Sequence, residues 1–387
     1  EVIPQLEEQT GIKIEHETYT DNQVTQKLTT EFAAGVSSID IFNVMLYQNM
    51  SVFENNDWLE PLDSFINDPV KSEGLYWEDF EKVYNNVTNS KGQIVGIPIG
   101  MNTDIVYYRK DILEKAGYTE FPKTYEEFEE MCQTVNDPDN NFYAFTARGE
   151  AAASLSSFSS FLYSYGGYYL EDGECAINTD VAIEAMKFYG KLLNKYGPPG
   201  VLNMGISQIS QVFSAGQTAC AIDTVGLNST LSDPEQCDYA DVLGIAPTPE
   251  GPKGRVNYSS VPWSYCMYKG SEKKDAAWEV LKFLTSREVY AKMPSLLPAR
   301  QYLYDNHILE QSLSPEFLEA VNINTVGAYY TNLPDMSSVL EARDIIGQVI
   351  TYSIQTAGEG PELKAKADEA KQKVDDLLKE SGEYKGQ

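Results

Sequence analysis

The chain has 387 residues, of which 42% are hydrophobic and 12% aromatic, so it is long enough for roughly two to three domains that each bury a core. Its 58 acidic and 29 basic residues give a formal net charge of −29, which disfavours nucleic acid and anionic membrane surfaces as partners. No stretch approaches the roughly 18 uninterrupted apolar residues of a membrane-spanning helix.

The first residues, Glu1 to Pro4, carry no initiator methionine and no signal-like apolar run. They are typical of the middle of a helical segment. We therefore expect a processed start, with any signal segment or lipid anchor absent from this chain.

Helices and strands alternate along the chain. Thr124 and Glu127 form a capping-box pattern before an amphipathic helix, and Asp21 is a candidate cap for an earlier one that ends at Gly35. The patterns predict further helices over 178–195, 271–286 and 363–379, and strands over 12–17, 39–42, 93–98, 105–108, 218–223 and 242–246. This alternation predicts α/β layers with parallel sheets, and the absence of a clear linker predicts that the chain crosses between domains more than once.

Residues for most enzymatic or metal chemistry are scarce. The chain has two histidines, His16 and His307, and none of the common nucleophile-elbow, phosphate-loop, dinucleotide or zinc-protease motifs. We therefore expect no catalytic residues, no metal and no cofactor. A pair of carboxylates acting as in a glycosidase stays open, because 58 acidic residues supply many pairs by chance. The five cysteines form no C-x-x-C pair and suit core positions, although one disulfide stays open.

Tyrosine is the enriched residue type, with 26 copies beside 15 Phe and 4 Trp. Several aromatics are expected in loops, among amides and hydroxyls, at 47–49, 163–169 and 262–265. A flat ring beside hydrogen-bonding side chains suits a sugar, whose C–H face stacks while its hydroxyls need matched partners. This argument makes Tyr163 and Tyr165 candidate ligand contacts.

The order of short motifs resembles family 1 extracellular solute-binding proteins of ABC importers. The motifs are TGIKI at 10–14, FAAG at 32–35, WLEPLD at 58–63, YYRKD at 107–111, PKTYEEF at 122–128, FSAGQTA at 213–219, PTPEGP at 247–252 and LPAR at 297–300. Each is weak alone, but together they cover nearly the whole chain in the family's order.

The resemblance implies a two-lobe periplasmic-binding-protein-like fold of type II, with hinge strands and a ligand cleft between the lobes. We expect residues 1–108 and 266–315 in the first lobe and 109–265 and 316–387 in the second, with the family's first strand missing. The resemblance also implies a carbohydrate or polyol ligand, hinge closure on binding, an ABC permease as partner and a monomer. The location would be the periplasm or, for a lipid-anchored form, the outer face of the cytoplasmic membrane.

Site residues are carried over where a neighbouring motif fixes their position. The resemblance implies ligand contacts at Asn43, Tyr47, Gln48, Asn102, Thr103, Asp223, Thr224, Trp263, Tyr265 and Arg300. The sequence departs from the family at Val225, where a tryptophan is frequent, and at Val261-Pro262, where two glycines are frequent. Pro262 to Tyr265 instead resembles a WSW segment of polyol- and some oligosaccharide-binding members.

Two other functions remain open at this point. One is a carboxylate-dependent glycosidase or other carbohydrate-active enzyme, which turnover of an oligosaccharide would reveal. The other is a secreted adhesion module, which a filled cleft and a contiguous apolar surface would favour.

Overall fold

The computed structural model describes residues 2–19, 21–81, 83–261, 263–293 and 297–386, which form two compact units. Unit 1 contains residues 1–101 and 260–313, and unit 2 contains 102–259 and 314–387. The chain therefore passes from one unit to the other three times. The crossings lie after residues 101, 259 and 313 rather than after 108, 265 and 315, because the predicted boundaries would cut through strands β3 (Asp104–Arg109) and β9 (Ser264–Met267).

Unit 1 is built on a small antiparallel sheet in the order β1 (Ile41–Val44), β9, β2 (Ile97–Pro98). Its helices are α1 (Ile3–Thr10), α2 (Asp21–Ala34), α3 (Leu46–Asn55), α4 (Asp63–Ile66), α11 (Lys274–Leu284), α12 (Arg287–Ala291) and α13 (Gln301–Asp305). Aromatic rings fill the core: Phe32 meets Phe42 and Trp58 edge-on at centroid distances of 5.3 and 5.8 Å. Such pairs stabilise the packing beyond the area that they bury.

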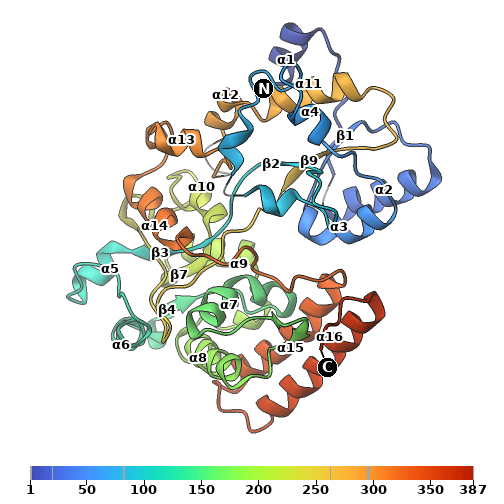
Figure 1. The fold of residues 1–387 in the computed structure, drawn as a ribbon. Coiled ribbons are helices and arrows are strands. Elements are labelled where there is room, and N and C mark those ends of the chain that lie inside the picture. Colours follow the sequence, from blue (N-terminus) through green and yellow to red (C-terminus); the bar gives the residue numbers. More distant parts are fainter. Residues whose placement is uncertain (1, 20, 82, 262, 294–296, 387) are drawn as a thin grey trace. The chain divides into compact units, whose positions relative to one another are not determined.

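Unit 2 has a four-stranded sheet in the order β4 (Tyr143–Thr146), β7 (Thr218–Thr224), β3, β8 (Leu243–Ala246). Its smaller helices are α5 (Lys110–Lys115), α6 (Tyr125–Val135), α9 (Ile206–Ser214), α10 (Asn228–Leu231) and α14 (Pro315–Thr325). The long helices are α7 (Ala151–Tyr165), α8 (Asp180–Tyr196), α15 (Val339–Gln355) and α16 (Leu363–Ser381), and a short hairpin pairs β5 (Leu170–Glu171) with β6 (Glu174–Cys175). Figure 1 shows these elements along the chain.

Two glycines let the long helices of unit 2 approach closely. A Cβ on Gly347 of α15 would collide with the carbonyl of Ala151 in α7, and one on Gly190 of α8 would collide with Ser353 of α15. α15 therefore comes close to α7 and α8 at the points where a glycine carries no side chain.

Most of the helices that were predicted from a strong sequence pattern are confirmed. Thr124 accepts from the Glu127 backbone amide at 3.2 Å, Glu127 bonds back to the Thr124 amide at 3.3 Å, and α6 follows. Helices over 21–34, 180–196, 274–284 and 363–381 and strands over 218–224 and 243–246 agree with their predictions to within a few residues.

The prediction of parallel sheets is wrong in most places. Among the described strands only β4 and β7 pair in parallel, while all other ladders are antiparallel. Alternation along the chain does not specify strand direction, because a crossing between units can return the chain either way. The alternating segment 12–17 forms no ladder, and the segment 93–98 contributes only the two-residue β2.

All five cysteines are buried free thiols, so the core reading is confirmed and the open disulfide is not formed. Burial raises the pKa of the Cys175 thiol to about 12, and burial also raises the pKa of the Cys132 thiol. In the described part of the chain, no helix combines the length and apolar character needed to cross a membrane.

Candidate functional site

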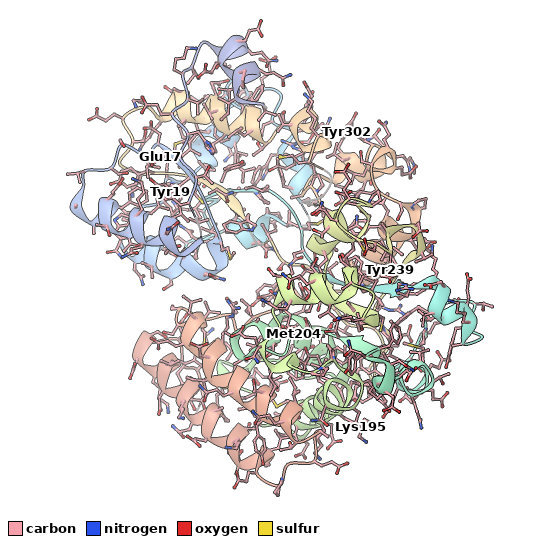
Figure 2. The ribbon with its side chains drawn as sticks, turned by 180° about the vertical axis from the view of Figure 1, so that it is seen from behind. Glu17, Tyr19, Lys195, Met204, Tyr239 and Tyr302 are labelled. Carbon is pink, nitrogen blue, oxygen red and sulfur yellow. The ribbon has the colours of Figure 1, made fainter. Side chains whose placement is uncertain are left out.

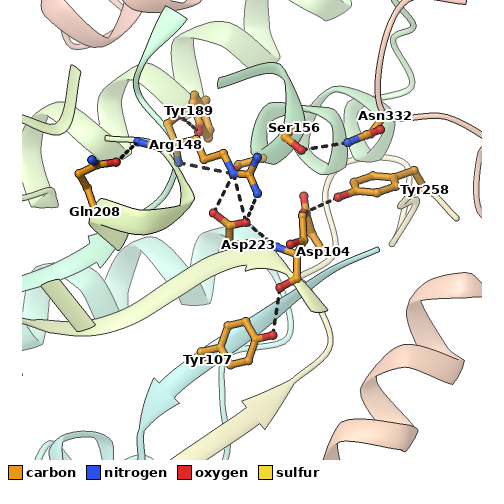
Figure 3. Close-up of polar contacts among 12 residues, drawn as sticks. Asp104, Tyr107, Arg148, Ser156, Tyr189, Gln208, Asp223, Tyr258 and Asn332 are labelled. Atoms are coloured by element: carbon orange, nitrogen blue, oxygen red, sulfur yellow. Dashed lines mark hydrogen bonds and ion pairs between the residues drawn. The ribbon is translucent and has the colours of Figure 1, made fainter. Parts of the chain in front are cut away.

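One end of the unit 2 sheet collects polar side chains. β4 and β7 run in parallel and finish at the same end, and the antiparallel β3 begins there. Arg148 follows β4, Asp223 and Thr224 close β7, and Asp104 opens β3 opposite Thr224. Figure 3 shows this end of the sheet, which is also where the chain enters unit 2 from unit 1 after residue 101.

Arg148 and Asp223 form a buried ion pair at the centre of this group. Arg148 Nε donates to both carboxylate oxygens of Asp223 at 3.1 and 3.0 Å, and Nη2 donates to Oδ1 at 2.6 Å. The Asp223 side chain is 0% exposed, and its Oδ1 also accepts from the Thr224 amide at 2.7 Å. Burial acts to lower the pKa of Arg148, but the Asp223 charge outweighs it and the pKa is raised overall. The two opposite charges balance each other in this buried pair.

Tyr189 of α8 fixes the backbone beside this pair by donating from its hydroxyl to the Arg148 carbonyl at 2.7 Å. Tyr107 does the same for β7, donating to the Thr224 carbonyl at 3.0 Å. Asp223 thus positions Arg148, and the predicted ligand contacts at Asp223 and Thr224 stay predictions.

Asp104 lies beside this pair with its carboxyl group only partly engaged. Its Oδ1 accepts from the Tyr258 hydroxyl at 2.7 Å, and its carbonyl accepts from the side-chain amides of Asn257 and Asn324 at 3.0 and 2.7 Å. Burial, followed by the negative charge of Asp223, raises the pKa of Asp104 to about 7.

Buried acceptors without donors mark the same region. Thr103 Oγ1, Asp104 Oδ2 and Asn228 Oδ1 are buried and have no hydrogen-bond partner. The Thr103 carbonyl accepts from the Val225 amide at 3.0 Å, which places Thr103 beside the turn leading to Asn228 and α10. An unsatisfied buried acceptor costs about 1–3 kcal/mol, so a cluster of them indicates a place where donors arrive from outside the chain. Thr103 was predicted as a contact, and the partly exposed Asn102 precedes it.

Unit 1 holds a second group of predicted residues around its sheet. Asn43 of β1 pairs with Tyr265 of β9, and both are partly exposed. Trp263 precedes β9, is partly exposed, and its carbonyl accepts from the Ile99 amide at 3.0 Å. Asn43 Oδ1 and Ser264 Oγ are buried without partners. Gln48 and the backbone of Tyr47 lie in α3. The side chain of Tyr47 and the whole of Pro262 fall outside the described part of the chain.

Tyr163 and Tyr165 are not in a loop, which corrects the prediction. They form the last turn of α7, which ends at Gly166 in a left-handed conformation. Tyr163 is 1% exposed and donates to the Thr331 carbonyl at 2.8 Å, so it is a core residue. Tyr165 is partly exposed and stacks on Tyr125 at 5.9 Å. The small residues before them do not give a clear helical pattern in the sequence, because several of the serines among them are buried in unit 2.

Arg300, a predicted ligand contact, lies in an ion-pair network inside unit 1. Its side chain is 0% exposed in unit 1, where it bonds to Asp79 at 2.8 Å and to the Thr285 carbonyl and lies 4.5 Å over the Phe80 ring. Arg287 forms a two-point pair with the same Asp79, with both bonds at 2.8 Å. This network holds unit 1 together. Arg300 Nη2 is buried without a hydrogen-bond partner, and the predicted ligand contact at Arg300 stays a prediction.

Two tyrosines complete the network around Arg287. Tyr76 and Tyr302, the latter labelled in Figure 2, have their rings 3.8 and 3.7 Å from its guanidinium carbon. Burial acts to raise the pKa of Asp79, but the hydrogen bonds from Arg287 and Arg300 outweigh it, so the pKa is lowered.

Several residues of the unit 2 group were not predicted. Arg148, Asp104 and Tyr258 stand in no motif, and only the sheet brings them together. A tyrosine surface was also missed: the Tyr329 ring lies 5.2 Å from Tyr168 and 4.7 Å from Tyr330, which is 46% exposed. The adjacent pair at 329–330 in a tyrosine-rich sequence was the one available signal.

No metal centre stands beside these groups in what the structure describes. Among the described residues, no cluster of three or more His, Cys, Asp or Glu side chains is suited to hold a metal ion. The arrangement is instead a set of fixed donors and acceptors that fits an uncharged, hydrogen-bonding molecule.

Comparison with known proteins agrees with a binding role. Residues 1–291 match the model of the bacterial extracellular solute-binding protein family, and the chain belongs to that family. A Brucella abortus protein described as a binding protein is 27% identical over 74% of this chain and 67% of its own length. The mannitol-binding protein of Pseudomonas aeruginosa is 25% identical over 70% of this chain and 62% of its own length.

A solved structure has the same fold. The ABC transporter solute-binding protein of Agrobacterium radiobacter, in complex with ribitol, superposes with a TM-score of 0.82 at 20% identity, covering 97% of this chain and 94% of that one. The predicted α/β fold of two-lobe binding proteins and the resemblance to family 1 are thereby confirmed.

Proposed function

We propose that this protein captures an uncharged sugar or polyol outside the cytoplasmic membrane and delivers it to an ABC permease without chemically changing it. The observation that carries the proposal is the cluster of buried acceptors lacking donors, at Thr103, Asp104 and Asn228, beside a charge-balanced Arg148–Asp223 pair. Hydroxyl groups of a ligand, or water molecules held with it, would supply the missing donors.

The ligand class follows from the charges and the relatives. Arg148 is already neutralised by Asp223, so this end of the sheet offers no spare positive charge to an anion. The relatives named above include binders of mannitol and ribitol, which are open-chain polyols. Linear polyols are therefore our first expectation, and cyclic sugars the second.

We further propose that residues of both units contribute contacts, with Trp263 and Asn43 from unit 1, and that the units close on the ligand as hinged bodies. A partly exposed indole offers a flat apolar surface to the C–H face of a polyol or sugar. Ligand binding would then select the closed state from an existing equilibrium.

Isothermal titration calorimetry with ribitol, D-mannitol and maltose tests the proposal, with inorganic phosphate and glutamate as charged comparisons. We expect heat from at least one hydroxyl-rich compound and none from the anions. Trp263→Ala should weaken that binding at least tenfold, whereas Tyr84→Ala, which removes an exposed ring of unit 1, should leave it unchanged. Binding of the anions alone would contradict the proposal, and release of reducing sugar from an oligosaccharide would favour the glycosidase alternative.

A further inference from the structure

Asp104 is joined to segments next to all three chain crossings. It stands third in unit 2 after the crossing at residue 101. Asn257 and Tyr258, which bond to its carbonyl and its carboxyl group, come just before the crossing at 259. Asn324 bonds to the same carbonyl from α14, the helix that begins directly after the crossing at 313. Asp104 thus connects, within unit 2, the three chain segments that lie next to the crossings.

The carboxyl group at this junction is incompletely satisfied. Asp104 is 0% exposed, Oδ1 has one donor in Tyr258 and Oδ2 has none. A carboxylate offers about four acceptor positions and pays heavily for burial when they stay empty, whereas a neutral carboxyl group pays much less.

The surrounding charges compensate an ionised Asp104 only in part. Arg148 acts to lower the pKa of Asp104, but Arg148 is paired with Asp223, whose negative charge raises that pKa more strongly. The other titratable groups that sense Asp104 are buried tyrosine hydroxyls, which stay neutral below pH 10: Tyr107 on β3, Tyr125 on α6, Tyr169 near β5, Tyr189 on α8 and Tyr258. The raised pKa of Asp104, about 7, is in line with this geometry.

We propose that Asp104 is a proton-dependent anchor, which holds the crossing segments to unit 2 while its carboxyl group is neutral and loosens them when it ionises. An ionised carboxyl group needs further donors at Oδ2, and in the ligand-free protein water would bring them. Water enters only if the segments carrying Tyr258 and Asn324 move apart from β3, so ionisation opens the junction.

The anchor has a consequence for ligand capture, and that consequence alone rests on the proposed function. The crossing segments are the parts of the chain about which the units would move. A junction held firmly at low pH and loosened at high pH would make ligand affinity fall as the pH rises through neutrality.

Hydrogen exchange on the ligand-free, full-length protein tests the anchor directly. The Ser259 amide donates to the Tyr329 carbonyl at 2.7 Å, and the Tyr329 amide donates to the Asn257 carbonyl at 2.8 Å, so both amides report on the junction. After correction for intrinsic rates, we expect their protection to fall at least tenfold from pH 6 to pH 8.5, while amides in the middle of α8 keep theirs. Equal protection of Ser259 and Tyr329 at both pH values would overturn the proposal.

Asp104→Asn is the decisive variant, because the amide keeps the shape and an acceptor for Tyr258 but never ionises. Its junction amides should show the same protection at pH 6 and pH 8.5. Glu184→Gln, on the surface of α8, is the matched control and should respond to pH like the unaltered protein. Persistence of the pH response in Asp104→Asn would refute the anchor.

A second measurement decides the case if Asp104→Asn fails to fold. Infrared difference spectra of the unaltered protein should show a buried carboxyl C=O band that disappears between pH 6 and pH 8.5, together with the loss of amide protection. If no such band titrates there, the inference is wrong. Calorimetry with ribitol and D-mannitol at the two pH values then tests the coupling to ligand binding, and we expect about tenfold weaker binding at pH 8.5. If neither compound binds, that result counts against the proposed function. The exchange and infrared results would still decide whether Asp104 is an anchor.

Discussion

The guanidinium of Arg148 and the carboxylate of Asp223 face each other inside unit 2 through three hydrogen bonds, the shortest 2.6 Å long. The pair joins the segment after β4 to the end of β7, and its position is kept by Tyr189 behind Arg148 and by the Thr224 amide. Neither partner can be removed alone without leaving a buried charge uncompensated.

We therefore expect Arg148→Met to lower the free energy of unfolding of unit 2 by about 3–5 kcal/mol, because Asp223 would keep its charge without a partner. The double variant with Asp223→Asn should recover part of this loss. Urea unfolding followed by far-UV circular dichroism measures both. Glu184→Gln removes one side of an exposed pair with Lys187 and should cause no measurable change; an equal loss there would contradict our interpretation.

The stability of the protein should depend on pH in two separate ranges. Asp104 has a folded-state pKa of about 7, above its unfolded value near 4, so the folded state holds a proton that the unfolded state releases. Its contribution therefore decreases as the pH rises from about 4 to about 7, at up to about 1.4 kcal/mol per pH unit. The pKa of Asp79 is lowered instead, so its contribution is present above about pH 4 and is lost in acid.

Chemical unfolding of the unaltered protein and of Asp104→Asn at pH 5, 6, 7 and 8 tests this sign. The difference in unfolding free energy between the two proteins should change steadily from pH 5 to pH 7 in favour of Asp104→Asn and then level off. A difference that does not vary with pH would show that Asp104 does not titrate in this range.

Arg300 should matter for the stability of unit 1 rather than for ligand binding. Arg300→Met leaves Asp79 with Arg287 alone and removes the bond to the Thr285 carbonyl, and we expect a loss of about 3–5 kcal/mol. All four tryptophans belong to unit 1, so intrinsic fluorescence follows its unfolding. Arg287→Met, at a half-buried position, should cost less. Weakened ligand binding with unchanged stability would instead restore Arg300 as a contact.

The close approach of α15 to α7 should not tolerate a single added methyl group. Gly347→Ala would press against the Ala151 carbonyl, and we expect a loss of at least about 2 kcal/mol in thermal or urea unfolding. Gly226→Ala is the matched control, because the nearest atom to its Cβ, Thr224 Oγ1, lies 3.5 Å away. Equal stability of the two variants would mean that the helices can separate without cost.

Local chemistry made part of this fold predictable. Thr124 and Glu127 mark a helix start by themselves, since each satisfies an amide of the other's backbone. The periodicity of α8 and α16 likewise depends only on neighbouring turns. The direction of the strands was not predictable, because β3 pairs with residues in 218–224 and 243–246, which come far later in the chain.

The site was predictable only where a motif fixed its position. Thr103 was reached by counting from the YYRKD segment, and its unpartnered hydroxyl agrees with a role there without testing it. Arg148 and Tyr258 were missed because their importance comes from Asp223 and Asp104, which are distant in sequence. The ion-pair network of Arg300 was not predictable, because its partner Asp79 is distant in sequence and is shared with Arg287.

The burial of all five thiols makes the molecule well suited to site-specific labelling. A maleimide dye would find no exposed native cysteine. Cysteines introduced at exposed positions, such as Val36→Cys in unit 1 and Leu340→Cys in unit 2, could therefore carry a donor and an acceptor fluorophore. Energy transfer between them would then record, one molecule at a time, how the two bodies rearrange when a polyol is added.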